Sequence, residues 1–256
     1  MRTVARLSIA PVKSLALQHP QRVRVEPFGV AEDRRFYVVE ADGRLVSGGR
    51  NGSLMRIRAT FDPSGERLAL AFPEGSRVEG EATELGEPVV TSFYGRPVSG
   101  RVLEGAWSEA LSAFLGRPVR LVRPDRPGDA MDKAPVTLVS SASAEELGRQ
   151  ARLSSSPDTR RFRMLVEIAG CRPHEEDTWA GRPLRMGEAV VRVVGPVPRC
   201  VVTTLGPDTG VKDLDTLKTI VAYRGVTPDQ DINFGVYAEV LEPGTMAVGD
   251  AVELTD

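Results

Sequence analysis

Short segments in which apolar and polar residues alternate fill most of the first hundred positions. Residues 3–9 (TVARLSI) follow this alternation and predict a strand with one buried face. Similar segments recur, separated by Gly, Pro, Asn and Asp residues typical of turns, at 22–27, 34–40, 43–47, 54–61, 67–72, 87–93 and 96–102. The pattern predicts a small all-β unit, a barrel or a sandwich, that ends near residue 102.

Helical periodicity enters after this point. Residues 106–115 have apolar positions at helical spacing, and Gly116 follows as an expected C-terminal cap. Further helices are expected after Ser143, with Glu146 in capping-box position, and over residues 214–224. Strands are predicted at 118–124, 136–140, 161–170, 183–195 and, as two strands, within 234–256. The chain is thus expected to be a β-rich α+β protein with a boundary near residues 100–105.

The composition narrows the function classes. The 33 basic and 35 acidic residues give a net charge of −2 and are interspersed, which argues against a nucleic-acid-binding protein. No apolar run approaches the ~20 residues of a membrane span. The N-terminus lacks the apolar segment of a signal peptide, so a cytoplasmic protein is expected. Residues 123–135 are rich in Pro and charge and predict an irregular surface loop.

Cysteine and histidine are scarce. Cys171 and Cys200 could form one disulfide, but they do not match a zinc or CxxC redox pattern. The only histidines, His19 and His174, exclude a histidine-rich metal site, and neither is close to Cys200 in sequence. A nucleophilic Cys200 would therefore lack an evident general base.

The stretch 195–210 (GPVPRCVVTTLGPDTG) carries the most distinctive chemistry. Cysteine is often an inert core residue, but Arg199 beside Cys200 would favour a thiolate. Thr203 and Thr204 could donate hydroxyl hydrogen bonds to an oxo group or an anion. A thiolate that binds a metal carried by an organic cofactor needs no general base, which favours this second interpretation.

Five basic residues form a second candidate constellation. They are Lys13, Arg34, Arg161, Arg163 and Arg199. Arg161 and Arg163 are expected on one face of the predicted strand, because residues two apart in a strand share a face. These cations either lie in solvent at strand ends or converge on a phosphate. Sequence spacing alone leaves both possibilities open.

Several motifs together resemble a known family. PVPRCVVTTLGPDTG, preceded by RFRMLVEIAGCRPHEEDTW and followed by LKTIVAYR, resembles the MOSC family, near the amidoxime-reducing components and their bacterial counterparts. PVKS (11–14) and EDRRFYVVEADGRLVS (32–47) resemble the MOSC N-terminal β-barrel domain. The resemblance covers essentially the whole chain. It implies an N-terminal domain over 1–103, a MOSC β-barrel domain with a few flanking helices over 104–256, and a site between them.

The resemblance further implies a molybdenum cofactor, a pterin dithiolene that carries the metal and a terminal phosphate. Cys200 takes the place of the cysteine that binds molybdenum directly. The implied cofactor contacts are Lys13, Ser14, Arg34, Ser140, Ser143, Arg163, Arg199 and Thr203.

Three positions depart from the family pattern. Met164-Leu165 stand where Pro-Asn usually follow the RFR motif, and Gly49 stands where an arginine is usual, with Arg50 one position later. Val236 replaces a glutamine in the family's late FGQ motif. These changes spare the metal ligand and affect the expected contacts of pterin and substrate.

The resulting hypothesis is a molybdenum-cofactor oxidoreductase that reduces N–O bonds of N-hydroxylated small molecules. Asp208 and Asp177 are candidate proton donors. Two cysteines cannot hold an iron–sulfur module, so a separate electron-donor protein of ferredoxin, flavin or cytochrome type is expected. The alternatives are a cofactor carrier or sulfur relay that uses a Cys200 persulfide, and a scaffold that has lost the cofactor.

Overall fold

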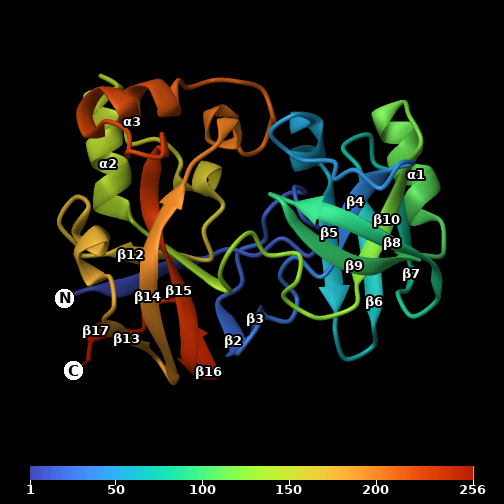
Figure 1. The fold of residues 1–256 in the computed structure, drawn as a ribbon, viewed down its shortest axis with the longest axis horizontal. Coiled ribbons are helices and arrows are strands. Elements are labelled where there is room, and N and C mark those ends of the chain that lie inside the picture. The colour runs from blue at the N-terminus through green and yellow to red at the C-terminus, as the bar shows by residue number, and fades with distance from the viewer. Residues whose placement is uncertain (256) are drawn as a thin grey trace.

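The computed structural model describes residues 1–255, which form two packed units side by side (Figure 1). The larger unit is built on a seven-stranded sheet. In sheet order its strands are β1 (Thr3–Leu7), β12 (Val166–Ala169), β11 (Val136–Ser140), β15 (Asn233–Glu242), β14 (Ala189–Pro198), β13 (Pro183–Met186) and β17 (Val252–Leu254). A bridge between Thr3 and Ala251 joins the two ends, so the sheet closes almost into a barrel.

A small sheet from both ends of the chain packs on this barrel. It consists of β16 (Gly244–Ala247), β2 (Arg22–Glu26) and β3 (Gly29–Val30). The buried core of the barrel accordingly includes six apolar side chains from the first thirty residues: Val4, Leu7, Ile9, Val23, Val25 and Val30. The first three strands of the chain therefore belong to the larger unit.

The second unit consists of two antiparallel sheets. One contains β4 (Tyr37–Glu40), β10 (Val119–Pro124), β9 (Arg96–Leu103) and β8 (Leu85–Phe93), and the other β5 (Arg58–Asp62), β6 (Arg67–Ala71) and β7 (Arg77–Glu81). Helix α1 (Trp107–Leu115) packs against β10 and β7. The indole N–H of Trp107 donates to the Leu68 carbonyl at 3.2 Å and links the helix to the second sheet.

The division expected from the sequence lies at residue 103. In the structure, β1, β2 and β3 pack with the barrel, Val12 and Leu15 between β1 and β2 pack in the core of the smaller unit, and α1 and β10 complete that unit as far as Pro124. The coarse prediction of a β-rich α+β fold is confirmed, and the sheets dominate both units.

The helices agree with the sequence pattern except at one end. Gly116, with φ of +67°, ends α1 as predicted, and α3 (Thr216–Arg224) lies within the predicted segment. Helix α2 (Ser141–Gln150) begins earlier than expected, because Ser140 and not Ser143 is its N-cap. No helix in the range 1–255 combines the length and apolarity needed to cross a membrane.

Four short 3₁₀ helices occupy segments that the pattern did not resolve. They are η1 (Gly52–Arg56), η2 (Thr159–Phe162), η3 (Glu175–Trp179) and η4 (Val201–Thr204). The strand predicted over 161–170 is wrong in its first half, where η2 ends at Arg163 in the left-handed region with φ of +54°. Arg161 and Arg163 consequently point to different partners and do not share a strand face.

Candidate functional site

Cys200 lies at the end of β14, immediately before η4. Its side chain is exposed and carries a free thiol. Pro196 and Pro198 precede it in a part of β14 where the pairing register shifts twice, so the strand bends as it reaches the cysteine. The Cys200 carbonyl accepts a hydrogen bond from the Thr203 N–H at 3.2 Å, which begins the turn of η4. The fold thus presents the thiol at a strand end.

Thr203 supports this turn from behind. Its hydroxyl donates to the Cys200 carbonyl at 3.1 Å and contacts the Thr216 hydroxyl of α3 at 2.8 Å. The side chain is completely buried. The structure therefore places Thr203 where it positions Cys200 through the backbone, without access to a bound group.

Lys13 is buried at the contact between the two units. Its ammonium donates to the Ala130 carbonyl at 2.9 Å and pairs with the Asp132 carboxylate at 2.5 Å. Burial lowers the pKa of Lys13, although the charge of Asp132 acts in the opposite direction. The loop 125–135, which the sequence pattern treated as surface, thus reaches into the site.

Two arginines extend this cationic region. Arg34 forms an ion pair with the buried Asp33 and donates to the Arg163 carbonyl at 3.0 Å. Arg163 in turn donates to the Leu15 carbonyl at 2.6 Å, two residues after Lys13. Burial, followed by the charge of Arg34, lowers the pKa of Arg163 to about 10. Lys13, Arg34 and Arg163 therefore bring three positive charges close together.

Arg199 connects the cationic region to Cys200. Its guanidinium donates to the Phe162 carbonyl at 2.5 Å and lies over the Phe162 ring, 5.5 Å from the centroid. The Met164 sulfur accepts a hydrogen bond from the same guanidinium at 3.2 Å. Burial lowers the pKa of Arg199, while the charge at Cys200 acts to raise it. The thiol therefore lies at the edge of the same cluster.

Positive charge exceeds negative charge in this cluster. Four cations, Lys13, Arg34, Arg163 and Arg199, face only two carboxylates, those of Asp33 and Asp132. In the part of the chain that the structure describes, the Nε atom of Arg199 is buried and has no hydrogen-bond partner. A buried excess of cations and an unused donor fit a doubly charged anion such as a phosphate monoester. An adjacent thiol fits a soft metal, so the residues suit a phosphate-bearing cofactor that carries one.

A glycine-rich loop closes the site against η4. The Gly48 N–H donates to the Ser14 hydroxyl at 2.9 Å, which ties residues 48–52 to the segment that carries Lys13. A Cβ atom on Gly49 would lie 3.0 Å from Val201, so the larger side chain that the family pattern has here would displace Val201. The close approach of Val201 thus explains why this chain has glycine at position 49, where the family pattern has arginine.

The other two departures differ in their relation to the cluster. Met164 contacts it, because its sulfur accepts from Arg199, whereas Leu165 and Val236 are buried in the core of the barrel. Tyr237, the next residue along β15, lies near Arg199, Asp132 and Cys200, whose charges act on its phenol. The apolar side chains at 165 and 236 therefore contribute to the barrel core.

Ser140 and Ser143 do not join the cationic cluster. Both are completely buried and their hydroxyls lie 2.7 Å apart at the N-terminus of α2. Ser143 also donates to the buried Glu176 carboxylate at 2.7 Å. The structure does not bring these serines to the cluster, because the Ser140 hydroxyl caps α2 and the Ser143 hydroxyl is held by Glu176 and the His174 N–H.

Three further candidates bind partners outside the cationic cluster: Asp208, Asp177 and Arg161. Both carboxylate oxygens of Asp208 accept from Arg160, at 2.8 and 2.6 Å. Asp177 pairs with Arg224 at 2.6 Å. Arg161 donates to the Thr203 carbonyl at 3.1 Å and supports η4 from its buried side.

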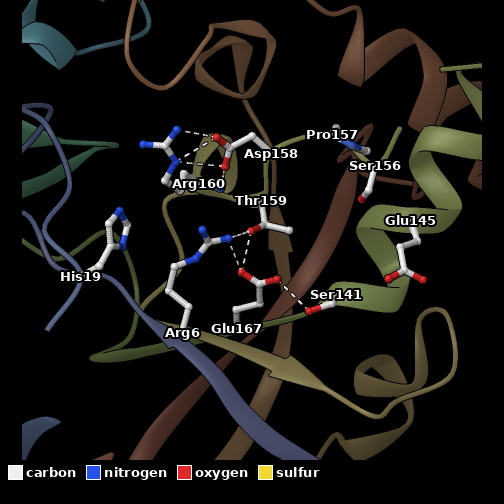
Figure 2. A pocket seen from close by; sticks show the side chains of 10 residues that line it. All are labelled: Arg6, His19, Ser141, Glu145, Ser156, Pro157, Asp158, Thr159, Arg160 and Glu167. Atoms are coloured by element: carbon white, nitrogen blue, oxygen red, sulfur yellow. Dashed lines mark hydrogen bonds and ion pairs between the residues drawn. The ribbon is translucent and has the colours of Figure 1, made fainter. Parts of the chain in front are cut away.

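A cavity of about 600 Å³ lies on a different part of the larger unit (Figure 2). Its polar groups pair with one another: Glu167 accepts from Arg6, Thr159 and Ser141. Arg160 is likewise held by Asp158. Cys200 and the four cations are absent from its lining. The Cys200 cluster, and not this cavity, is therefore the candidate functional site.

Sequence reasoning missed three residues at this cluster. Asp132 lies in the loop 125–135, and although burial acts to raise its pKa, the charges of Lys13 and Arg34 hold that pKa below its usual value. Tyr94 and Tyr237 contribute phenols near Cys200. Only an acidic residue in a loop of mixed charge hinted at Asp132, and nothing in the local pattern marked the two tyrosines.

Comparisons with known proteins give the family of the chain. Two family models match: the MOSC N-terminal beta barrel domain over residues 1–118 and the MOSC domain over residues 125–253. Mitochondrial amidoxime-reducing component 1 of Homo sapiens is 28% identical over 282 residues, spanning 98% of this chain and 82% of the relative. Mitochondrial amidoxime reducing component 2 of Rattus norvegicus is 36% identical with the same coverage. The solved structure of the YuaD protein from Bacillus subtilis covers 99% of this chain and 96% of its own, at 13% identity and a TM-score of 0.45.

Proposed function

The chain belongs to the MOSC family, and from this premise we propose that it is a molybdenum-cofactor-dependent reductase of N-hydroxylated small molecules. The relatives named amidoxime-reducing components, which align with nearly the whole chain, support the reaction class. The observation that carries the proposal is the exposed Cys200 thiol at the edge of a cluster with two more cations than carboxylates.

The residues of the cluster would divide the task of holding the cofactor. Lys13, Ser14, Arg34 and Arg163 would bind its phosphate, where arginine supplies forked hydrogen bonds and lysine a point charge. Arg199 would offer its unused Nε–H beside the metal. Cys200 would supply a soft thiolate ligand.

When bound, the molybdenum cofactor supplies two-electron oxygen-transfer chemistry at the substrate. Conversion of an N–OH group to N–H and water consumes two electrons and two protons. The electrons would come from a separate donor protein of ferredoxin, flavin or cytochrome type. Asp208 is no longer proposed as the proton donor, because Arg160 occupies both of its carboxylate oxygens.

Reduction of benzamidoxime with a reduced artificial electron donor tests the proposal. The protein should be produced in a host that makes the cofactor. Wild type is expected to form benzamidine, and Cys200→Ser should lose at least about 100-fold in rate, as expected for loss of a direct metal ligand. Cys171→Ser is the matched control, because Cys171 lies far from the cluster in the barrel and burial raises the pKa of its thiol to about 12.

Molybdenum and pterin analysis of the same protein, alongside the assay, gives each alternative function its own result. Full molybdenum content without benzamidoxime reduction would contradict the reductase and favour a carrier. A wild type that holds neither molybdenum nor pterin would favour a scaffold without cofactor.

A further inference from the structure

The tip of the β8–β9 hairpin carries an unusual aromatic residue. Tyr94 adopts φ of +52° and is followed by Gly95 with φ of +88°. Two residues with positive φ between paired strands form the turn in which Asn, Asp or Gly is preferred at the first position. A tyrosine there adds backbone strain, and strained residues of this kind cluster at functional sites.

The residues on both sides of Tyr94 hold the tip firmly. Phe93 is buried and packs edge-on against Tyr37, with 5.1 Å between ring centroids. The Lys13 ammonium lies 5.3 Å from the Phe93 ring centroid. Arg96 donates to the carbonyl of Met131 at 2.8 Å and so ties the hairpin to the loop that carries Asp132. The tip is therefore anchored to the cationic cluster itself.

Tyr94 itself is not held by packing. Its side chain is 74% exposed, in contrast to the buried Phe93 next to it. In Figure 1, strand β8 ends toward the unit that carries Cys200. The charges that act on the Tyr94 phenol are those of Asp132, Cys200, Tyr237 and Arg199. A rigid support thus holds an exposed aromatic ring at the edge of the cationic cluster, next to the residues that contact Lys13 and the Asp132 loop.

We propose that Tyr94 is a substrate-contacting residue that favours substrates with a planar group next to the N–O bond. Its ring packs against the planar group and its hydroxyl donates a hydrogen bond to the N–O oxygen. This inference rests on the function proposed above and names a specificity-determining residue of that site.

The Tyr94 hydroxyl is available as a hydrogen-bond donor. A tyrosine phenol has a usual pKa of about 10 and keeps its proton at neutral pH, and the carboxylate of Asp132 acts in the same direction.

Substitution by asparagine separates this role from folding. Asparagine is favoured at the strained turn position, so Tyr94→Asn should fold and raise the melting temperature by a few degrees. Calorimetry should show that the non-reacting product benzamidine binds about tenfold more weakly to the cofactor-loaded variant than to cofactor-loaded wild type, as expected for a lost aromatic contact. For benzamidoxime, KM should rise by a similar factor, with kcat changed less than about threefold.

Two further variants complete the experiment. Tyr94→Phe keeps the ring and loses the hydroxyl that donates to the N–O oxygen. It should bind benzamidine, which has no such oxygen, as wild type does, and should raise KM for benzamidoxime about threefold. Val90→Thr is the matched control, because Val90 is exposed on the same strand, and it should bind benzamidine as wild type does.

Equal benzamidine affinity of wild type and Tyr94→Asn would overturn the inference, and so would a wild type that does not bind benzamidine. Calorimetry involves no turnover, so this result is separate from the reductase assay. A wild type that binds benzamidine through Tyr94 but does not reduce benzamidoxime would contradict the proposed function alone.

Discussion

Arg163 shows how a single residue of the cluster can lower the stability of the cofactor-free protein. It adopts the left-handed conformation, is surrounded by protein and lies beside the like charge of Arg34. Each of these features is unfavourable unless a partner compensates for it. A bound dianion would neutralise the excess charge and offset the strain.

This reasoning predicts that inorganic phosphate stabilises the cofactor-free protein. Millimolar phosphate should raise the melting temperature of wild type above that in chloride of equal ionic strength, because binding to the folded state alone shifts unfolding. Arg163→Asn removes one charge and tolerates the left-handed conformation, so the shift should fall by about half or more. An equal shift in both proteins would show that phosphate acts elsewhere.

Glu176 is a buried acid whose titration affects stability. Its Oε1 accepts from the Ser140 N–H at 3.1 Å and from Ser143, whereas its Oε2 is buried without a partner in residues 1–255. Burial raises the pKa of Glu176 above its usual value. The folded protein therefore favours the protonated acid. The stability that this acid contributes is fully present below its unfolded pKa and is lost as pH rises through the folded pKa.

Glu176→Gln is expected to remove this pH dependence. Glutamine keeps the acceptor for Ser140 and Ser143 and stays neutral at every pH. Between pH 4 and 8, the unfolding free energy of wild type should fall relative to the variant, by at most about 1.4 kcal/mol per pH unit. Urea unfolding at several pH values measures the difference. A difference that does not change with pH would contradict the raised pKa of the acid.

The sequence alone could predict only part of the cationic cluster. The sequence marked Lys13, Arg34, Arg163 and Arg199 as basic, but the backbone carbonyls and carboxylates that orient them lie far away in the chain. Ser140 was misjudged because a serine at a strand-to-helix junction can cap the helix equally well. The role of Ser140 is set by Glu176, thirty-six residues later in the chain, whose carboxylate accepts from the Ser140 N–H.

At the scale of elements, two loops meet at their glycines. A Cβ on Gly52 would lie 1.9 Å from the carbonyl oxygen of Gly210, a distance that no packed structure permits. The loop 48–52 of one unit can therefore approach the loop after Cys200 only because both residues lack side chains. This contact holds the glycine-rich loop against the site.

Gly52→Ala is predicted to separate the two loops. Forcing backbone atoms apart should lower the free energy of unfolding by about 1–3 kcal/mol. Gly65→Ala is the control, since its Cβ would meet only the ends of flexible side chains at 3.2 Å or more, and its effect should stay within about 0.5 kcal/mol. Chemical denaturation of both variants decides the matter, and equal effects would rule out the close approach.

Strongly periodic elements were predictable and short ones were not. The helix that ends at Gly116 and the hairpin of β13 and β14 follow from local pattern alone. The 3₁₀ turn η2 has four residues, too few for periodicity to appear, so the sequence suggested a strand in its place. That turn separates Arg161 from Arg163 and sends them to different partners.

At the scale of the whole molecule, the chain returns to the barrel after building the smaller unit. Strand β1 pairs with β12, and β2 pairs with β16. Such pairings join residues more than 150 positions apart, so no local pattern could place β1 and β2 with the strands of the larger unit. This route brings Lys13 and Arg34, which follow the first strands, to the same place as Arg163 and Arg199.

The central claim is that this convergence builds a molybdenum-cofactor site with Cys200 as the metal ligand. Molybdenum and pterin analysis of protein from a cofactor-producing host tests it most directly, with Cys200→Ser and the control Cys171→Ser. Wild type and Cys171→Ser should hold molybdenum and pterin near stoichiometry, and Cys200→Ser should lose the metal. Molybdenum retained in Cys200→Ser, or absent from wild type, would contradict the account.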